Sequence, residues 1–174
     1  MSSIQSLSIR SAKVKDLPHL VNLLAYSAEA RPYLFHFINP QAQLRILRLR
    51  YTFEKYLDRI RRFFVSLSPR ELVTSSADRA ILVAEHQGDN KIVGAMFLSN
   101  IGSGIWSLDI LVTHPNYREI GVGAALLREG TDLIKAANGK RLLVSVIEGS
   151  RAEAFYLNRG FTVTYRLAEL ELGL

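Results

Sequence analysis

Three apolar segments joined by short turns occupy residues 79–113, and they constrain the fold more than any other feature of the sequence. "RAILVAEH" (79–86) and "KIVGAMFLSN" (91–100) have the length and apolar content of strands, and turn residues 88–90 separate them. So short a connection predicts an antiparallel hairpin. "GIWSLDILVT" (104–113) follows after "IGSG" and predicts a third strand. We therefore expect the chain to be built on an antiparallel sheet.

The segments before this sheet predict a strand and two helices. Alternating apolar positions in "SLSIR" (6–10) indicate a first strand. Asp16 is expected to cap a following helix, with Pro18 in its first turn and an apolar face that extends to Ala28. A longer amphipathic helix is expected over residues 45–68, because apolar residues recur there at spacings of three and four.

The long helix also concentrates the charge of the chain. Residues 45–70 hold eight basic residues against two acidic ones, a net charge of +6 that equals the net charge of all 174 residues. A solvated helix face accounts for this stripe, and attraction of an anionic cofactor or substrate is a second interpretation. Nucleic-acid binding is disfavoured because no aromatic residues alternate with the basic ones on that face.

After the three strands, the pattern predicts a helix, a strand and a shorter helix. Apolar residues share one face over residues 122–137, and "RLLVSVI" (141–147) has the composition of a buried strand. Ser150 and Glu153 predict a capping box at the start of the short helix. "FTVTYRLAELEL" (161–172) is expected to form one more strand or two very short ones.

Composition limits the classes of protein to which the chain can belong. With 48% hydrophobic residues it suits one compact domain over residues 1–174, able to bury about two-thirds of its unfolded surface. No apolar run is long enough for a signal peptide or a membrane span, so we expect a cytoplasmic protein. The absence of cysteine excludes disulfides and a cysteine nucleophile, and the four scattered histidines predict no metal site.

A glycine-containing turn, "THPNYREIGVGAALL" (113–127), links the third strand to the next helix. Glycine accepts positive φ and close ligand approach, so N–H groups can converge at the positive end of a helix and hold an anion. A Rossmann dinucleotide site is weakly supported because its third small residue falls on Leu126, and no P-loop run occurs. What remains is R-x-x-G-x-G, formed by Arg118, Gly121 and Gly123.

These residues resemble a motif of the GNAT superfamily of N-acetyltransferases, in which the turn binds the pyrophosphate of acetyl-coenzyme A. A second segment, "RAEAFYLNRGF" (151–161), is similar to the family's A-x-x-x-Y-x-x-x-G-F, with Ala152, Tyr156, Gly160 and Phe161 in register. The order of elements resembles the family over nearly the whole chain. The resemblance implies a single α/β domain, a mixed and mostly antiparallel sheet with helices on both faces, and acetyl-coenzyme A as acetyl donor.

The resemblance also implies which positions hold the coenzyme. The backbone N–H groups of Leu111, Val112 and Thr113 are expected to donate hydrogen bonds to the pantetheine amides and to the oxyanion. Positions expected at the pyrophosphate are Arg118, Glu119, Ile120, Gly121, Val122, Gly123 and Ala124. The chain departs from the family pattern twice, because Glu119 replaces a frequent glycine and Gly149 replaces a frequent asparagine.

Acetyl transfer to an amine needs a base for the amine, donors for an oxyanion and a proton for the departing thiolate. The resemblance points to Tyr156 as the acid, and a core tyrosine packed over Ala152 is the alternative. Asp109 interrupts the apolar run "LDILV". A carboxylate in such an apolar setting is suited to act as a base, through a water molecule. A salt-bridged strand residue facing outward is the alternative for Asp109, and His114 is expected to be a loop residue.

The connector "RPYLFHFINP" (31–40) corresponds to one wall of the family's acceptor site, so Tyr33, Phe35 and His36 are candidate substrate contacts; packing on the core is the alternative. We predict direct attack by a primary amine in a ternary complex. A small-molecule acceptor is the first expectation, and a protein N-terminus or lysine is the second. A catalytically silent acyl-coenzyme A sensor and a nucleic-acid-binding module are the rival functions. Little sequence follows Phe161, so we expect a shortened terminal strand pair and a homodimer that completes the sheet edge.

Overall fold

The computed structural model of the chain describes residues 7–24, 26 and 78–166. The chain divides into two compact units, Met1–Leu143 and Val144–Leu174. Two sets of predicted features lie outside the described residues: the aromatic connector with Tyr33, Phe35 and His36, and the basic helix.

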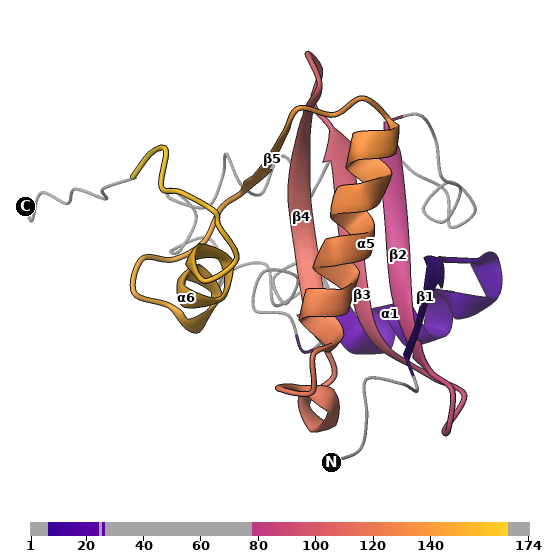
Figure 1. Cartoon of the computed structure of the whole chain (residues 1–174). Coiled ribbons are helices and arrows are strands. Elements are labelled where there is room, and N and C mark those ends of the chain that lie inside the picture. The colour runs from indigo at the N-terminus through magenta and orange to yellow at the C-terminus, as the bar shows by residue number, and fades with distance from the viewer. Residues whose placement is uncertain (1–6, 25, 27–77, 167–174) are drawn as a thin grey trace, which may run out of the picture. The chain divides into compact units, whose positions relative to one another are not determined.

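The predicted strands form a five-stranded sheet in the order β1-β2-β3-β4-β5 (Figure 1). The strands are β1 (Leu7–Ser11), β2 (Arg79–His86), β3 (Lys91–Asn100), β4 (Ile105–Thr113) and β5 (Arg141–Val144). Each neighbouring pair from β1 to β4 is antiparallel. The predicted hairpin and third strand are therefore confirmed.

The last strand of the sheet runs parallel to β4. The N–H groups of Lys140 and Arg141 both donate to the carbonyl of Gly104, at 2.7 and 3.3 Å. Gly104 directly precedes β4, so a neighbour of β4 that begins there must run in the same direction. The sheet is thus mixed and mostly antiparallel, as predicted. With four residues against nine, β5 leaves the carboxyl end of β4 extending beyond it.

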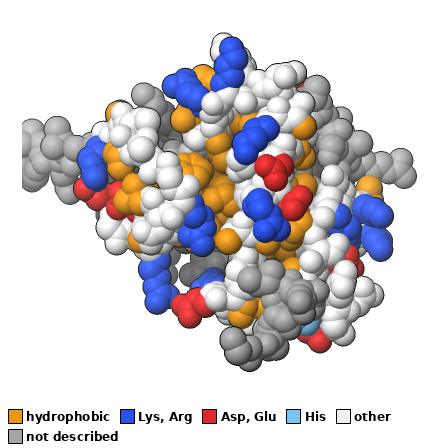
Figure 2. Space-filling view, in the orientation of Figure 1, with side chains coloured by type: hydrophobic (Ala, Val, Ile, Leu, Met, Phe, Trp, Pro, Cys, Tyr) orange, Lys and Arg blue, Asp and Glu red, His pale blue; other side chains and the backbone are white. Residues whose placement is uncertain are grey.

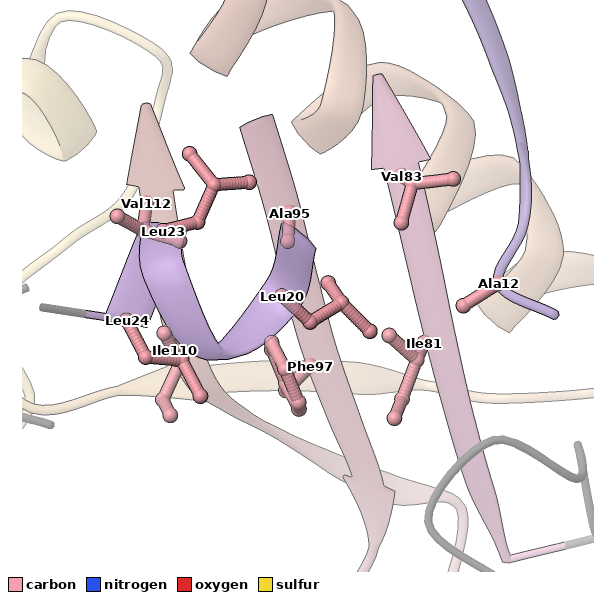
Figure 3. Packing of buried hydrophobic residues seen from close by; sticks show 10 residues of the cluster. All are labelled: Ala12, Leu20, Leu23, Leu24, Ile81, Val83, Ala95, Phe97, Ile110 and Val112. Atoms are coloured by element: carbon pink, nitrogen blue, oxygen red, sulfur yellow. The ribbon is translucent and has the colours of Figure 1, made fainter. Parts of the chain in front are cut away.

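Helices cover both faces of this sheet (Figure 1). Helix α1 (Leu17–Leu24) packs on one face, and α5 (Val122–Ala136) packs on the other. Ten residues form the buried cluster beneath α1 (Figure 3): Ala12, Leu20, Leu23, Leu24, Ile81, Val83, Ala95, Phe97, Ile110 and Val112. Successive strand residues point to opposite faces, so Gly94 and Met96 of β3 face α5. A Cβ atom on Gly94 would lie 2.6 Å from Val122 Cγ1. Glycine at this position therefore lets the start of α5 approach the sheet closely.

The predicted helix cap at Asp16 is wrong. A 3-10 helix, η2 (Val14–Asp16), comes directly before α1, and Asp16 accepts from the N–H of Lys13 at 2.8 Å. The Arg10 guanidinium donates to both carboxylate oxygens of Asp16, at 2.7 and 3.1 Å, and to Glu85 at 2.8 Å. The buried carboxylate therefore bonds to a cation on β1 and to the N–H of the residue before η2.

The second unit contains α6 (Arg151–Leu157), and its predicted cap is confirmed with one variation. Ser150 Oγ accepts from the N–H of Glu153 at 3.1 Å, as a capping box requires. The Glu153 carboxylate accepts at 2.6 Å from the N–H of Gly149, one residue before the cap. The helix start is thus stabilised at both Gly149 and Ser150.

The segment after α6 contradicts the predicted strand over residues 161–166, which have no regular structure. The N–H of Phe161 donates to the carbonyl of Tyr156, which ties the chain to the helix end. Arg166 pairs with Glu148, in the loop before α6. These local contacts hold the segment against its own unit in place of a strand ladder. β5 ends at Val144, three residues earlier than predicted.

In the described part of the chain, no helix is long and apolar enough to cross a bilayer. The same residues contain no cluster of three metal-ligating side chains.

Candidate functional site

The site begins where β4 ends. A 3-10 turn, η5 (Pro115–Tyr117), follows the strand, and His114 Nδ1 accepts from the N–H of Asn116 at 3.3 Å. The N–H of Arg118 donates to the carbonyl of Pro115 at 3.2 Å. His114 is therefore a loop residue, as predicted, and it caps the turn that presents Arg118.

Two residues in the left-handed region then direct the chain into α5. Glu119 has φ 65° and Gly121 has φ 94°. A left-handed conformation costs a residue with a Cβ about 1–2 kcal/mol. Glu119 therefore occupies a position whose backbone favours glycine. This conformation gives a physical reason for the frequent glycine at that place in the family pattern.

The start of α5 presents backbone donors without acceptors inside the helix. Gly121 is the N-cap and supplies no side-chain cap. Helix geometry leaves the N–H groups of Val122, Gly123 and Ala124 without an intrahelical acceptor. These groups carry the positive end of the helix dipole, which favours an anion.

Arg118 adds a full positive charge beside these donors. Its side chain is exposed, and Nε donates to the carbonyl of Thr113 at 3.3 Å. This bond ties the guanidinium to the end of β4 through one nitrogen. The planar group suits bidentate binding of phosphate by its remaining N–H donors.

The backbone of β4 offers further donors along the edge opposite β3. The N–H of His114 donates to Val93 of β3 at 2.8 Å. Because N–H groups of successive strand residues point to opposite sides, those of Leu111 and Thr113 face away from β3. The N–H of Val112 faces β3. Two of the three predicted backbone donors are thus directed to the edge that extends past β5.

Asp109 occupies a β-bulge of β4. Phe97 of β3 opposes Ile110 and Leu98 opposes Leu108, so Asp109 is the extra residue. Its side chain is only 5% exposed and accepts from Ser99 Oγ at 2.7 Å. Asp109 is therefore a buried carboxylate that accepts a hydrogen bond from a hydroxyl, and the predicted alternative in which it faces outward is wrong.

Tyr156 is buried within the second unit. Its ring packs edge-to-face against Phe155 and Phe161, with centroids 5.1 and 5.2 Å away. The ring thus has a packing role in α6, and its part in proton transfer stays a prediction.

Sequence reasoning missed two partners of the site. Ser99 bonds Asp109, and Asp89 accepts a hydrogen bond from the hydroxyl of Tyr117, the residue before Arg118. Ser99 is on β3, which pairs with the strand that carries Asp109. The register of these two strands could therefore have indicated Ser99 as a partner of Asp109. Asp89 drew attention only as a turn residue, and nothing in its spacing indicates Tyr117.

The outer surface of α5 is mixed in charge. Figure 2 shows basic and acidic side chains together over this helix, where Arg128, Glu129, Asp132 and Lys135 are exposed. Such a surface differs from the one-sided basic stripe that binds nucleic acid.

Comparison with protein families gives one match that bears on this site. The model of the acetyltransferase (GNAT) domain matches residues 77–163, half of the chain, from just before β2 to beyond α6. The comparison with curated proteins gave no match.

Solved structures share the fold. An acetyltransferase from Trypanosoma brucei is 21% identical, with 95% of this chain and 99% of that one covered and a TM-score of 0.59. The PaiA N-acetyltransferase from Thermoplasma acidophilum, solved with coenzyme A, is 24% identical, with 91% of both chains covered and a TM-score of 0.59. An aminoglycoside acetyltransferase from an uncultured soil sample, solved with sisomicin, is 15% identical, with 98% and 97% covered and a TM-score of 0.61.

The family match includes the bulged strand, the left-handed turn and the helix start described above, together with the second motif in α6. The chain belongs to the GNAT family of acetyltransferases, enzymes that take the acetyl group from acetyl-coenzyme A.

Proposed function

We propose that this protein transfers an acetyl group from acetyl-coenzyme A to the primary amine of a small molecule, by direct attack in a ternary complex. The observation that supports it most is the start of α5. There Gly121 turns the chain in the left-handed conformation and three backbone N–H groups lack intrahelical acceptors beside the exposed Arg118.

We assign the pyrophosphate of the coenzyme to this turn. Residues 119–124 supply backbone donors, and Arg118 supplies charge-assisted hydrogen bonds. The pantetheine arm extends along the free edge of β4, where the N–H groups of Leu111 and Thr113 match its amides and the thioester oxygen. A thioester oxygen held in this way has donors in place when it becomes an oxyanion.

In the proposed reaction the acceptor nitrogen attacks the thioester carbonyl carbon. An ammonium acceptor must first lose one proton, and Asp109 accepts it through water. A bond forms between nitrogen and carbon, the carbon–sulfur bond then breaks, and the electron pair leaves with sulfur. Tyr156 is the proposed donor of a proton to the thiolate, the second proton lost by the nitrogen replaces it on the phenol, and Asp109 returns the first proton to solvent. The products are an N-acetyl amide, coenzyme A and one proton released to solvent.

The small-molecule acceptor is supported by analogy of fold. One neighbour is an aminoglycoside acetyltransferase solved with sisomicin, and another is a glucosamine-6-phosphate N-acetyltransferase. Both names describe small amines. Tyr33, Phe35 and His36 are the proposed acceptor contacts from the chain's own sequence.

The experiment is a thiol-release assay with acetyl-coenzyme A and a panel of amines: aminoglycosides, amino sugars, polyamines and peptides with a free N-terminus. The proposal predicts amine-dependent release of coenzyme A, fastest with a small molecule. Fastest release with a peptide would move the acceptor to proteins. Coenzyme A binding without release for any amine would favour the sensor and contradict the enzyme.

A homodimer is the proposed assembly. Among the described residues β5 is the last strand of the sheet and has only four residues, and an edge of this kind is a common place for a second copy to add. Sedimentation at increasing protein concentration checks the proposal, and a monomer at the highest concentration contradicts it.

A further inference from the structure

A contact between two segments far apart in sequence joins the turn proposed to bind phosphate to the turn between β2 and β3. The hydroxyl of Tyr117 donates to the carboxylate of Asp89, which lies 28 positions earlier in the turn between β2 and β3. His86 Nδ1 lies 3.2 Å from the same carboxylate. We call His86, Asp89 and Tyr117 the turn clamp.

The clamp fixes the ring of Tyr117 as well as its hydroxyl. Ring centroids of His86 and His114 lie 5.3 and 5.6 Å from that of Tyr117, at interplanar angles of 58° and 75°. His114 in turn packs edge-to-face against Tyr26, at 5.1 Å. A row of four rings thus runs from His86 at the end of β2 to Tyr26, two residues after α1.

The residues that follow the clamp have little other support. Tyr117 comes directly before Arg118, and Arg118, Glu119 and Ile120 are exposed. Within the described part of the chain, residues 114–121 make several side-chain hydrogen bonds. The bond from Tyr117 to Asp89 is the one that reaches a segment distant in sequence. The bond from Arg118 reaches only the adjoining end of β4. Glu119 is also in the left-handed region, which favours other conformations if the turn is released.

We propose that Asp89 and Tyr117 are positioning residues, which hold Arg118 and the start of α5 in the geometry that binds coenzyme A. The inference rests on the proposed function of that turn. Binding to a turn already in its bound conformation avoids an ordering cost, so the clamp raises affinity without touching the ligand. It acts equally on ground state and transition state, so its loss raises KM and leaves kcat unchanged.

The protonation states agree with this role. The hydrogen bond from Tyr117 holds the pKa of Asp89 below its ordinary value, and Asp89 raises the pKa of the Tyr117 phenol. Carboxylate acceptor and phenol donor therefore persist at neutral pH. The neighbouring His86 and Lys91 also lower the pKa of Asp89.

The test is a double-mutant cycle with Tyr117→Phe, Asp89→Ala and the double variant, measured by titration calorimetry with coenzyme A. Phenylalanine keeps the ring contacts with His86 and His114 and removes only the donor. We expect each single variant to bind about three- to tenfold more weakly, and the double variant to bind no more weakly than the weaker single one. KM for acetyl-coenzyme A should rise by the same factor, with kcat within about twofold of wild type.

The control is Tyr165→Phe, which removes an exposed hydroxyl from the second unit. It should bind like wild type. Unchanged affinity in the clamp variants, or additive losses in the double variant, overturns the clamp. A lower melting temperature with unchanged affinity assigns these residues to stability alone and also overturns it. If the wild type itself fails to bind coenzyme A, the proposed function of the turn fails, and the clamp fails with it.

Discussion

Glu119 has two features that oppose phosphate binding at the turn. Its backbone is in the left-handed region, with φ 65°, and its carboxylate stands in a turn proposed to bind phosphate. Glu119→Gly removes both, so we expect coenzyme A to bind about two- to fivefold more tightly at low salt, from the lost repulsion of one exposed charge. The gain should shrink as salt screens that charge.

Glu119→Gln is the matched control, because it removes the charge and keeps a Cβ in the left-handed conformation. Tighter binding in both variants assigns the effect to charge. Tighter binding in the glycine variant alone assigns it to backbone conformation. Unchanged affinity in both, measured by calorimetry at low salt, contradicts a phosphate beside residue 119.

Tyr156 combines packing with a proposed chemical role, and one substitution separates them. Tyr156→Phe keeps the ring and its contacts with Phe155 and Phe161. The acid role predicts a fall in kcat of about 10²–10⁴-fold with coenzyme A affinity unchanged. A core role alone predicts a kcat within about twofold of wild type, measured at saturating substrates and with the chemical step rate-limiting. That result would contradict Tyr156 as the acid.

Asp109 shows how far residue-level prediction extends. A lone carboxylate in an apolar run marked the residue, but its burial and its bond to Ser99 depend on a bulge. A bulge arises from the pairing of two strands, so the alternation within one strand does not reveal it. The sequence favoured an outward orientation for Asp109, and only the pairing of β3 with β4 shows that the residue is buried.

At the level of elements, strands with strong local patterns were predicted closely. β2 and β3 have the predicted bounds, and α5 begins at the predicted Val122. Prediction was wrong where another contact, tertiary or local, competes with the pattern in the sequence. Asp16 has the composition of a helix cap, but Arg10 on β1 pairs with it, and residues 161–166 are tied to α6 instead of forming a strand.

The Arg10–Asp16–Glu85 network joins β1, η2 and β2, and it predicts a pH dependence of stability. The hydrogen bond from Arg10 holds the pKa of Asp16 below its ordinary value of 3.8. A lowered carboxyl pKa contributes stability that is present above the ordinary value and is lost as pH falls through the folded-state pKa. Asp16→Asn should therefore cost about 1.5–3 kcal/mol of unfolding free energy at pH 7, and the difference should vanish in strong acid.

Urea unfolding of wild type and Asp16→Asn between pH 7 and pH 2 measures this difference. Asp132→Asn is the matched control, because it removes an exposed carboxylate of α5 outside the network, and it should show no comparable loss. A difference that stays constant down to pH 2 contradicts an ionic role for Asp16.

For the whole molecule, the order of the described elements was predictable because each has its own hydrophobic pattern. The pairing of β1 with β2, the parallel β5 and the pairing of Tyr117 with Asp89 were not, because they join residues 28 or more positions apart. The fold agrees with solved acetyltransferases at TM-scores of 0.57–0.61. The family match rests on residues 77–163, which include the glycine turn.

The central claim is that the turn from Arg118 to the start of α5 binds the coenzyme, and calorimetric titration of coenzyme A into wild type and Arg118→Ala tests it most directly. Loss of charge-assisted bonds worth about 1.5–3 kcal/mol predicts affinity about ten- to a hundredfold weaker. Arg128→Ala, on the exposed face of α5, should bind like wild type. Equal affinity of folded Arg118→Ala and wild type would contradict the account.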